Sequence, residues 1–190
     1  MNLILASASP RRQDLLTSAG LKFQCKSPDI DEVKRPEESP ISYAERNALE
    51  KAREVFQNPP KTESEGPLMV LAADTIVKLG EVCLEKPGTD QEAIAMLRSL
   101  SHRSHEVVTA YALIRAEAQD PIVGHEITHV EFRNLGNAEI ERYVATGEPF
   151  DKAGGYGIQG GAAGFVNKIN GSYTNVVGLP LAQILPLLSQ

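Results

Sequence analysis

The sequence predicts an α/β protein built around a mixed β-sheet. Short apolar runs at residues 3–6 and 21–26 alternate with helical patterns in the first part of the chain. Residues 68–73 are continuously apolar, as in a strand buried on both faces. Two longer strand patterns, 107–115 and 122–133, then follow each other directly. Alternating strands and helices followed by a strand pair favour a sheet with both parallel and antiparallel neighbours.

Two helices are expected in the N-terminal part. Residues 10–19 follow Ser9, a suitable N-cap, and begin with Pro10, which is favoured at the first helical position. Gly20 then provides a stop. The second helix opens at a Ser-Pro pair and covers residues 40–56.

The later elements have equally local signals. Residues 75–79 and 81–84 alternate around Gly80, which predicts a hairpin. Thr89 and Glu92 have the spacing of a capping box and open a further helix. Apolar periodicity predicts two more helices, at residues 138–145 and 180–188.

Length and composition favour one globular domain over residues 1–190. The hydrophobic fraction of 42% is sufficient for a core, and the net charge of −6 argues against a large nucleic-acid-binding face. No apolar run approaches the ~20 residues of a membrane helix, and the first residues lack the pattern of a signal peptide. A cytoplasmic protein without membrane partners is expected. Cys25 and Cys83 lack metal-ligand spacing and are expected to be reduced core residues.

The segment 7–12 is the first candidate for chemistry. It joins a predicted strand to a predicted helix and contains Ser7, Ser9, Arg11 and Arg12. Free backbone N–H groups and the helix dipole favour anions at such a position. The segment predicts a phosphate site, and the alternative is a capped helix with two solvated arginines.

Asp74 is the second candidate, because it comes where the apolar run 68–73 ends. Ligands of open α/β sheets bind outside the carboxyl ends of strands, so this carboxylate could bind a metal or accept a proton. The alternative is a turn or helix-cap aspartate. Asp29, Asp31 and Glu32 could join it around Mg²⁺, or form a solvated acidic loop.

Lys51 interrupts a helical face that is otherwise small and apolar. Ala44, Ala48 and Val55 lie on the same face, so this lysine either extends to solvent or meets an anion. Asn47, one turn earlier, is a second polar residue near that face.

The segment 151–160 is rich in glycine and contains Lys152 and Gln159. Glycines permit close backbone approach, and the amide of Gln159 could pair with the edge of a base. Lys86 follows the predicted hairpin. The alternative is a glycine-rich turn. The four histidines show no metal spacing, and His105 is interpreted as a hydrogen-bonded structural loop residue.

Several of these motifs together resemble the Maf family of nucleotide pyrophosphatases, once described as septum-formation inhibitors. The matching segments run in order along the chain, at residues 7–16, 45–52, 73–77, 85–87, 105–107, 151–160 and 171–180. The resemblance implies an elongated mixed sheet flanked by helices, in the inosine-triphosphatase-like (Maf/Ham1) fold, with a central cleft between two lobes. It also implies a divalent metal (Mg²⁺ or Mn²⁺, with Co²⁺ as an alternative) and often a homodimer.

The resemblance assigns roles residue by residue. Asp74 would be the catalytic carboxylate and, with Glu32, would hold the metal. Arg11, Thr75 and Gln159 would shape substrate preference. The triphosphate would be held by four cationic side chains: Arg12, Lys51, Lys86 and Lys152.

The implied reaction is hydrolysis of dTTP and UTP, with modified pyrimidine nucleotides as further substrates, to the monophosphate and pyrophosphate. Glutamine at position 159 is similar to the branch that acts on dTTP and UTP, whereas the 7-methyl-GTP branch usually has glutamate there. One rival is the same reaction on another base. The other is a non-enzymatic regulator of septation that only binds nucleotide.

Overall fold

The computed structural model describes residues 2–61 and 66–189, which divide into two compact units. The first unit contains Met1–Asp74, Thr109–Glu126 and Gly178–Gln190, and the second contains Thr75–Val108 and Ile127–Val177. Three long strands contribute residues to both units, so neither unit is a continuous piece of sequence. The expectation of a single domain over the whole chain stays a prediction.

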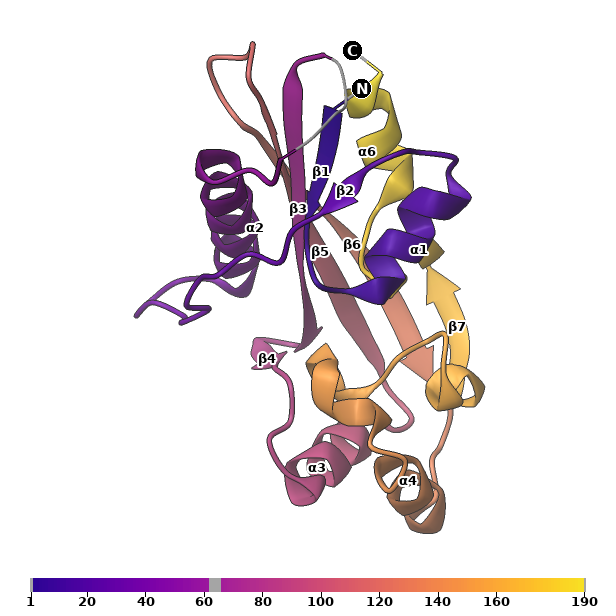
Figure 1. Cartoon of the computed structure of the whole chain (residues 1–190). Coiled ribbons are helices and arrows are strands. Elements are labelled where there is room, and N and C mark those ends of the chain that lie inside the picture. The colour runs from indigo at the N-terminus through magenta and orange to yellow at the C-terminus, as the bar shows by residue number, and fades with distance from the viewer. Residues whose placement is uncertain (1, 62–65, 190) are drawn as a thin grey trace. The chain divides into compact units, whose positions relative to one another are not determined.

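The described strands form one seven-stranded mixed sheet, which confirms the predicted fold class. The main path runs β2-β1-β3-β5-β6-β7, and β4 pairs with β3 (Figure 1). The strands are β1 (Asn2–Ala6), β2 (Gln24–Cys25), β3 (Leu68–Leu79), β4 (Val82–Leu84), β5 (Ser104–Arg115), β6 (Ile122–Phe132) and β7 (Val166–Asn170). β1 pairs in parallel with β2 and β3, while the β3–β4 and β6–β7 pairs are antiparallel.

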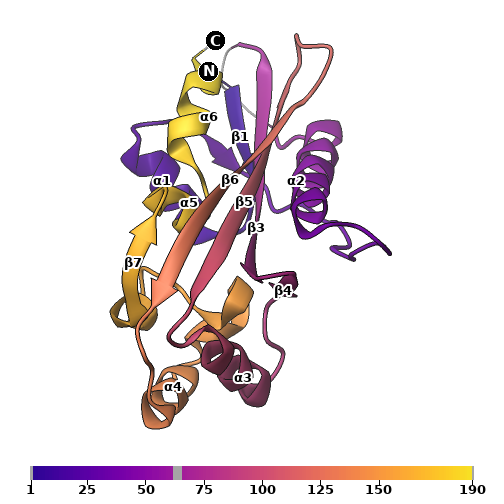
Figure 2. The same cartoon turned by 180° about the vertical axis from the view of Figure 1, so that it is seen from behind.

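In the first unit, helices cover both faces of the sheet. α2 (Pro40–Gln57) lies on one face, and α1 (Pro10–Ser18) and α6 (Leu181–Leu188) lie on the other (Figures 1 and 2). β1 is buried along its whole length between these layers. This burial on both faces explains its uninterrupted apolar sequence.

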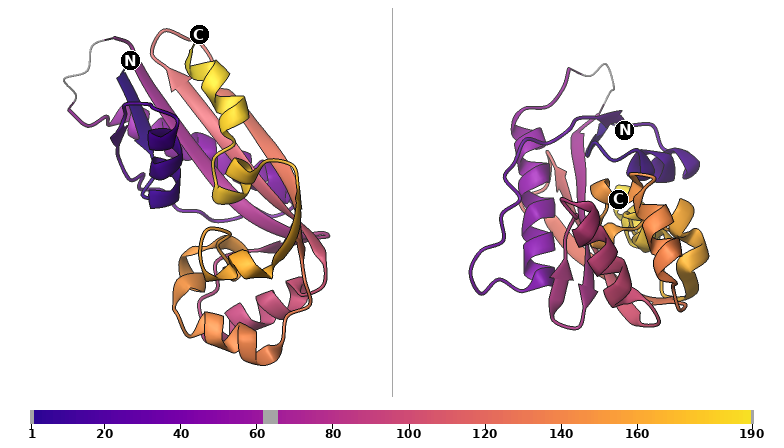
Figure 3. Two further views of the ribbon diagram at one scale, coloured as in Figure 1. Left: turned by 90° about the vertical axis from the view of Figure 1, so that its right-hand side faces the viewer. Right: turned by 90° about the horizontal axis from the view of Figure 1, so that it is seen from below.

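The second unit packs helices and short turns around an aromatic core. α3 (Asp90–Leu100) contacts α4 (Asn137–Val144) and the 3₁₀ turn η2 (Ala153–Gly155), as the left view of Figure 3 shows. The turns η1 (Glu148–Asp151) and η3 (Gly161–Phe165), together with α5 (Tyr173–Val177), complete it. Phe132, Tyr143, Tyr156 and Phe165 meet in edge-to-face contacts inside this core.

Most predicted element ends agree with the structure. Pro10 begins α1, and Gly20 follows it with a φ of 76°. Gly80 makes the β3–β4 turn, and the Thr89 hydroxyl accepts from the backbone N–H of Glu92 at the start of α3. No helix or strand was assigned from the sequence between residues 161 and 179, but this stretch contains β7 and α5.

The prediction for the two cysteines was only half correct. Both thiols are free, but Cys25 is exposed and Cys83 is only half-buried, so neither is a core residue. The apolar run around Cys25 forms a strand of two residues, and this strand lies at the end of the main sheet path. An edge strand has solvent on one side, which explains the exposure. Within the described residues, no helix is long and apolar enough to span a bilayer.

His105 is structural, as predicted, but it lies in β5 and not in a loop. Its ring is buried, and its Nε2 lies 2.7 Å from the Tyr156 hydroxyl. Burial lowers the pKa of His105 from 6.5 to about 4. The folded protein therefore keeps this ring neutral at pH values where the unfolded chain protonates it.

We predict that His105 makes the protein less stable as the pH falls below about 6.5. Because the folded pKa is the lower one, the stability contribution is complete above pH 6.5 and is lost toward pH 4. The loss between pH 7.5 and pH 5 should be about 2 kcal/mol. Urea unfolding of the wild type and His105→Gln measures it. The variant should lose this part of the pH dependence, whereas His129→Gln, at an exposed position of β6, should keep it. Equal pH dependence in wild type and His105→Gln would contradict the assignment.

Candidate active site

Asp74 lies inside β3 and not at the end of a strand, which corrects the sequence-based placement. β3 continues without a break from Leu68 to Leu79, so the predicted strand and the first arm of the hairpin are one element. The parallel ladder with β1, however, ends at the pair Ala6–Ala72. Asp74 therefore lies just beyond the carboxyl end of β1, the position at which α/β sheets bind ligands.

The side chain of Asp74 is buried and paired with Lys51. The Lys51 Nζ lies 2.6 Å from Asp74 Oδ1, and the two side chains are only 8% and 9% exposed. Lys51 thus meets an anion and does not extend to solvent, which settles the alternative left open by the sequence. The small residues Ala44, Ala48 and Ala52 of α2 are fully buried. They let the helix approach β3 closely enough for the lysine to reach the carboxylate.

Asn47 holds the other oxygen of the same carboxylate. Its Nδ2 donates to Asp74 Oδ2 at 3.2 Å, so each carboxylate oxygen accepts one hydrogen bond from α2. Asn47 is fully buried, and its Oδ1 has no hydrogen-bond partner. The sequence signal for this residue was its place four positions before Lys51 on a face of small residues.

Glu32 also contacts Lys51, from the loop between β2 and α2. Its Oε1 lies 3.1 Å from Lys51 Nζ, and its side chain is 40% exposed. The Tyr43 hydroxyl of α2 donates to the Glu32 carbonyl at 2.9 Å and so fixes this part of the loop. Asp29 and Asp31 are exposed, and for them the reading as a solvated acidic loop applies.

A second ion pair ties the same loop to α2. Arg46 donates to both carboxylate oxygens of Glu38, at 2.7 and 2.9 Å, and to the Val33 carbonyl at 2.9 Å. Hydrogen bonds from Arg46 lower the pKa of Glu38 from 4.5 to about 2. The loop that presents Glu32 is therefore anchored to α2 at Glu32 itself and at two positions after it, Val33 and Glu38.

Arg12, a cationic residue of the first unit, is held in place by hydrogen bonds that include one to Ser7. The Arg12 guanidinium donates from Nε to the Gly178 carbonyl at 2.8 Å and from a terminal nitrogen to Ser7 Oγ at 3.3 Å. Burial lowers the pKa of Arg12, while the charges of Asp74 and Glu32 oppose that shift. The positive charge of Arg11 also lowers the pKa of Arg12. Arg12 is thus within electrostatic range of both carboxylates.

The described residues fit a metal site with few protein ligands. No group of three His, Cys, Asp or Glu side chains converges anywhere in residues 2–61 and 66–189. Mg²⁺ typically takes one or two carboxylates and completes its shell with water and substrate phosphates. Asp74 and Glu32 share one ammonium, each Asp74 oxygen retains a lone pair, and the buried Oδ1 of Asn47 is an unused oxygen.

The other predicted residues belong to the second unit. Thr75 follows Asp74 in β3, and Lys86 is exposed after β4. Lys152 donates to the Glu148 carbonyl at 2.7 Å and to Asp151 at 2.5 Å, and Gln159 is exposed in a turn. Their convergence with Asp74 on one substrate stays a prediction.

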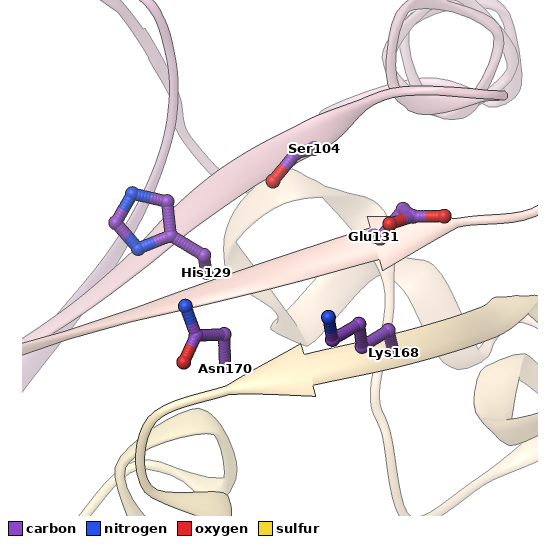
Figure 4. Close-up of a pocket in the computed structure, with 5 residues that line it drawn as sticks. All are labelled: Ser104, His129, Glu131, Lys168 and Asn170. Atoms are coloured by element: carbon purple, nitrogen blue, oxygen red, sulfur yellow. The ribbon is translucent and has the colours of Figure 1, made fainter.

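A hollow of about 180 Å³ on the second unit is lined by none of these residues. It lies on β5, β6 and β7, between Ser104, His129, Glu131, Lys168 and Asn170 (Figure 4). Glu131 already accepts from Asn167 at 2.7 Å. None of the residues that line it was predicted as functional.

Comparison with known proteins identifies the family. The family described as "Maf-like protein" matches residues 2–190. The chain belongs to the Maf-like family. The dTTP/UTP pyrophosphatase of Desulfotalea psychrophila is 48% identical to this Maf-like chain over 186 residues, which cover 98% of the chain and 92% of the relative. The dTTP/UTP pyrophosphatase of Salmonella typhimurium is 49% identical over 187 residues, with 98% and 91% covered. The Staphylococcus aureus Ham1 protein is a similar solved structure, with a TM-score of 0.46, 16% identity, and 70% and 72% coverage.

We predict that Lys51→Met destabilises this Maf-like protein by about 3 kcal/mol, because it leaves the buried Asp74 carboxylate without its cation. Urea unfolding at pH 7 measures the loss, and the double variant Lys51→Met/Asp74→Asn should recover part of it. Lys78→Met is the matched control, since the Lys78–Glu106 pair at 3.1 Å is more exposed and should be worth less than about 1 kcal/mol. Equal losses of unfolding free energy in the two lysine variants would show that the buried Lys51–Asp74 pair contributes no more than the more exposed Lys78–Glu106 pair.

Proposed function

We propose that this chain hydrolyses dTTP and UTP to the nucleoside monophosphate and pyrophosphate, with a divalent metal ion. The supporting observation is a buried carboxylate, Asp74, held by Lys51 and Asn47 in a chain that aligns almost end to end with relatives named dTTP/UTP pyrophosphatase. The proposal includes a cytoplasmic enzyme that acts as a homodimer. Modified pyrimidine nucleotides are further substrates, and a role in septum formation would be a consequence of the activity.

The cationic groups would bind the triphosphate. Phosphoryl transfer depends mainly on positioning and on neutralising charge as the leaving group departs. Arg12 presents a forked guanidinium already oriented by Ser7 and Gly178, which suits bidentate contact with phosphate oxygens. Lys86 and Lys152 would add point charges toward the leaving pyrophosphate, and Arg11 would bind beside Arg12.

Asp74 and Glu32 would hold the metal, and the Asn47 Oδ1 atom would accept a hydrogen bond from a water molecule at the site. A bound divalent ion supplies charge neutralisation at the phosphate and lowers the pKa of a coordinated water. Asp74 would accept the proton of the attacking water. Lys51 and Asn47 fix its two oxygens from one side, so the remaining lone pairs of the carboxylate have a defined direction.

Gln159 would read the base. Its amide offers one donor and one acceptor group, which complement the O4 and N3–H edge that uracil and thymine share. That shared edge accounts for action on both dTTP and UTP, and Thr75 would help to shape the same preference. Gln159 is exposed, so the amide is available to a ligand.

We predict that Asp74→Asn abolishes release of pyrophosphate from UTP and dTTP while the protein remains folded. The amide keeps the size of the side chain but cannot accept the proton. The assay follows pyrophosphate over a panel of nucleotides with and without Mg²⁺, and circular dichroism checks the fold. Asp14→Asn, at an exposed position of α1, should behave like the wild type. Near-normal turnover by Asp74→Asn would remove this residue from the reaction.

The same panel separates the rival functions. Preferred hydrolysis of 7-methyl-GTP would replace the pyrimidine substrates by another base with the same chemistry. Nucleotide binding without metal-dependent release of pyrophosphate would favour a non-enzymatic regulator of septation. The buried Lys51–Asp74 pair argues for the enzyme, because a pure binder needs no carboxylate beside its phosphate site.

We predict that Gln159→Glu lowers kcat/KM for UTP and dTTP about tenfold, because the carboxylate cannot donate to O4. The Mg²⁺ concentration that gives half-maximal rate should not change. Gln91→Glu, at an exposed position of α3, is the control for the added charge. An unchanged nucleotide profile in Gln159→Glu would exclude Gln159 from base recognition.

A further inference from the structure

Glu148 lies at the centre of a hydrogen-bond network in the second unit, outside every residue predicted from the sequence. It opens the turn η1, directly after Gly147, which has a φ of 76°. Its Oε1 accepts from the Tyr143 hydroxyl at 3.0 Å, and its Oε2 accepts from the backbone N–H of Gly161 at 2.9 Å. Both carboxylate oxygens are therefore engaged within the fold.

Tyr143 extends this network from Glu148 to the backbone of Gly157. Its hydroxyl donates to Glu148 and accepts from the backbone N–H of Gly157 at 3.2 Å. The ring is buried in α4 and contacts Phe165 edge to face, with centroids 5.2 Å apart. Burial raises the pKa of Tyr143, so the hydroxyl keeps its proton and remains a donor at neutral pH.

The Tyr143–Glu148 pair thus ties both ends of the segment 157–161, and Gln159 is its middle residue. The segment also closes on itself, because the Gly160 N–H donates to the Gly157 carbonyl at 3.1 Å. A side chain at Gly160 would collide with the Glu148 carboxylate, which shows how closely the backbone follows it. Gln159 itself is exposed at the tip of this turn.

Lys152 is attached to the same residue through a different atom. Its ammonium donates to the backbone carbonyl of Glu148, not to the carboxylate. A change of the Glu148 carboxylate therefore releases the Gln159 turn without removing the partner of Lys152. A change in base selectivity through Gln159 can therefore be distinguished from a change in phosphate binding through Lys152.

We propose that Tyr143 and Glu148 are positioning residues that determine base selectivity by fixing the turn that presents Gln159. The inference rests on the proposed function, in which Gln159 reads uracil and thymine. A glutamine amide distinguishes the O4 and N3–H edge of uracil from the N4–H and N3 edge of cytosine only while its orientation is fixed. A loosened turn lets the amide rotate and accept both bases.

Tyr143→Phe and Glu148→Ala test the proposal. Tyr143→Phe keeps the ring contact with Phe165 but removes both ties of the hydroxyl. Glu148→Ala removes both carboxylate oxygens, so the Tyr143 hydroxyl loses its acceptor and the Gly161 N–H loses its carboxylate partner. The measurements are kcat and KM for UTP, dTTP and CTP, and inhibition by inorganic pyrophosphate. Each variant should lower the ratio of kcat/KM for UTP over CTP about tenfold, chiefly through KM, with unchanged inhibition by pyrophosphate.

Tyr156→Phe is the control for a general loss of stability. It removes a buried hydroxyl that bonds to His105 in the same unit, but it leaves both ties of the turn intact. Its UTP/CTP ratio should equal that of the wild type. Gln159→Ala identifies the base contact independently and should lower the same ratio.

The outcomes separate the two proposals. A wild-type chain that does not hydrolyse UTP refutes the proposed function and this inference with it. If Gln159→Ala changes the ratio but Tyr143→Phe and Glu148→Ala do not, the function stands and the positioning role is refuted. Equal loss of selectivity in Tyr156→Phe would likewise overturn it, because destabilisation alone would then explain the effect.

Discussion

The ion pair between Lys51 and Asp74 is the constraint on which the candidate site depends. Two charges that are each about nine-tenths buried carry a large desolvation cost, which only close contact and additional hydrogen bonds offset. Asn47 on Asp74 and Glu32 on Lys51 supply those bonds. The small residues on the inner face of α2 follow from the same requirement, since a larger side chain would hold the helix away from β3.

The charged side chains of the candidate site in the first unit have a small cationic excess. Arg11, Arg12 and Lys51 contribute three positive charges, and Glu32 and Asp74 contribute two negative ones. The excess is one charge, although the whole chain carries −6. A polyphosphate is negative and a divalent metal ion is positive. A site with both cationic and anionic side chains can therefore bind the metal–polyphosphate complex more tightly than it binds either ligand by itself.

In the second unit, hydrogen bonds to the backbone of a turn, and not a buried ion pair, position the candidate residue Gln159. Apart from Thr75 in β3, the unit's candidate ligand groups Lys86, Lys152 and Gln159 lie on loops and turns, which are mobile unless their backbone is tied down. Glu148 and Tyr143 provide these ties for the turn of Gln159, and contact with Phe165 in the aromatic core fixes the tyrosine ring. The glycines at positions 157 and 160 are needed for close approach to Lys152 and Glu148, and not only for turn flexibility.

Local signals in the sequence predicted the class of the sheet and the helix ends. They also showed that Lys51 interrupts an otherwise apolar helical face. Pro10, Gly20, Thr89 and Gly80 act through backbone geometry within a few residues, so their positions could be predicted without a fold. The resemblance of the motifs to the Maf family extended the prediction to Asp74 and its cationic partners.

Only the tertiary structure decided what those residues touch. Lys51 could have reached solvent, and its partner lies 23 residues away in sequence. Asp74 turned out to be interior to a strand because β3 continues past the end of β1. Glu148 carried no signal at all, since its partners Tyr143 and Gly161 meet it only through the packing of α4 against the turns. Contacts between distant segments depend on how the elements pack, and no local pattern encodes that.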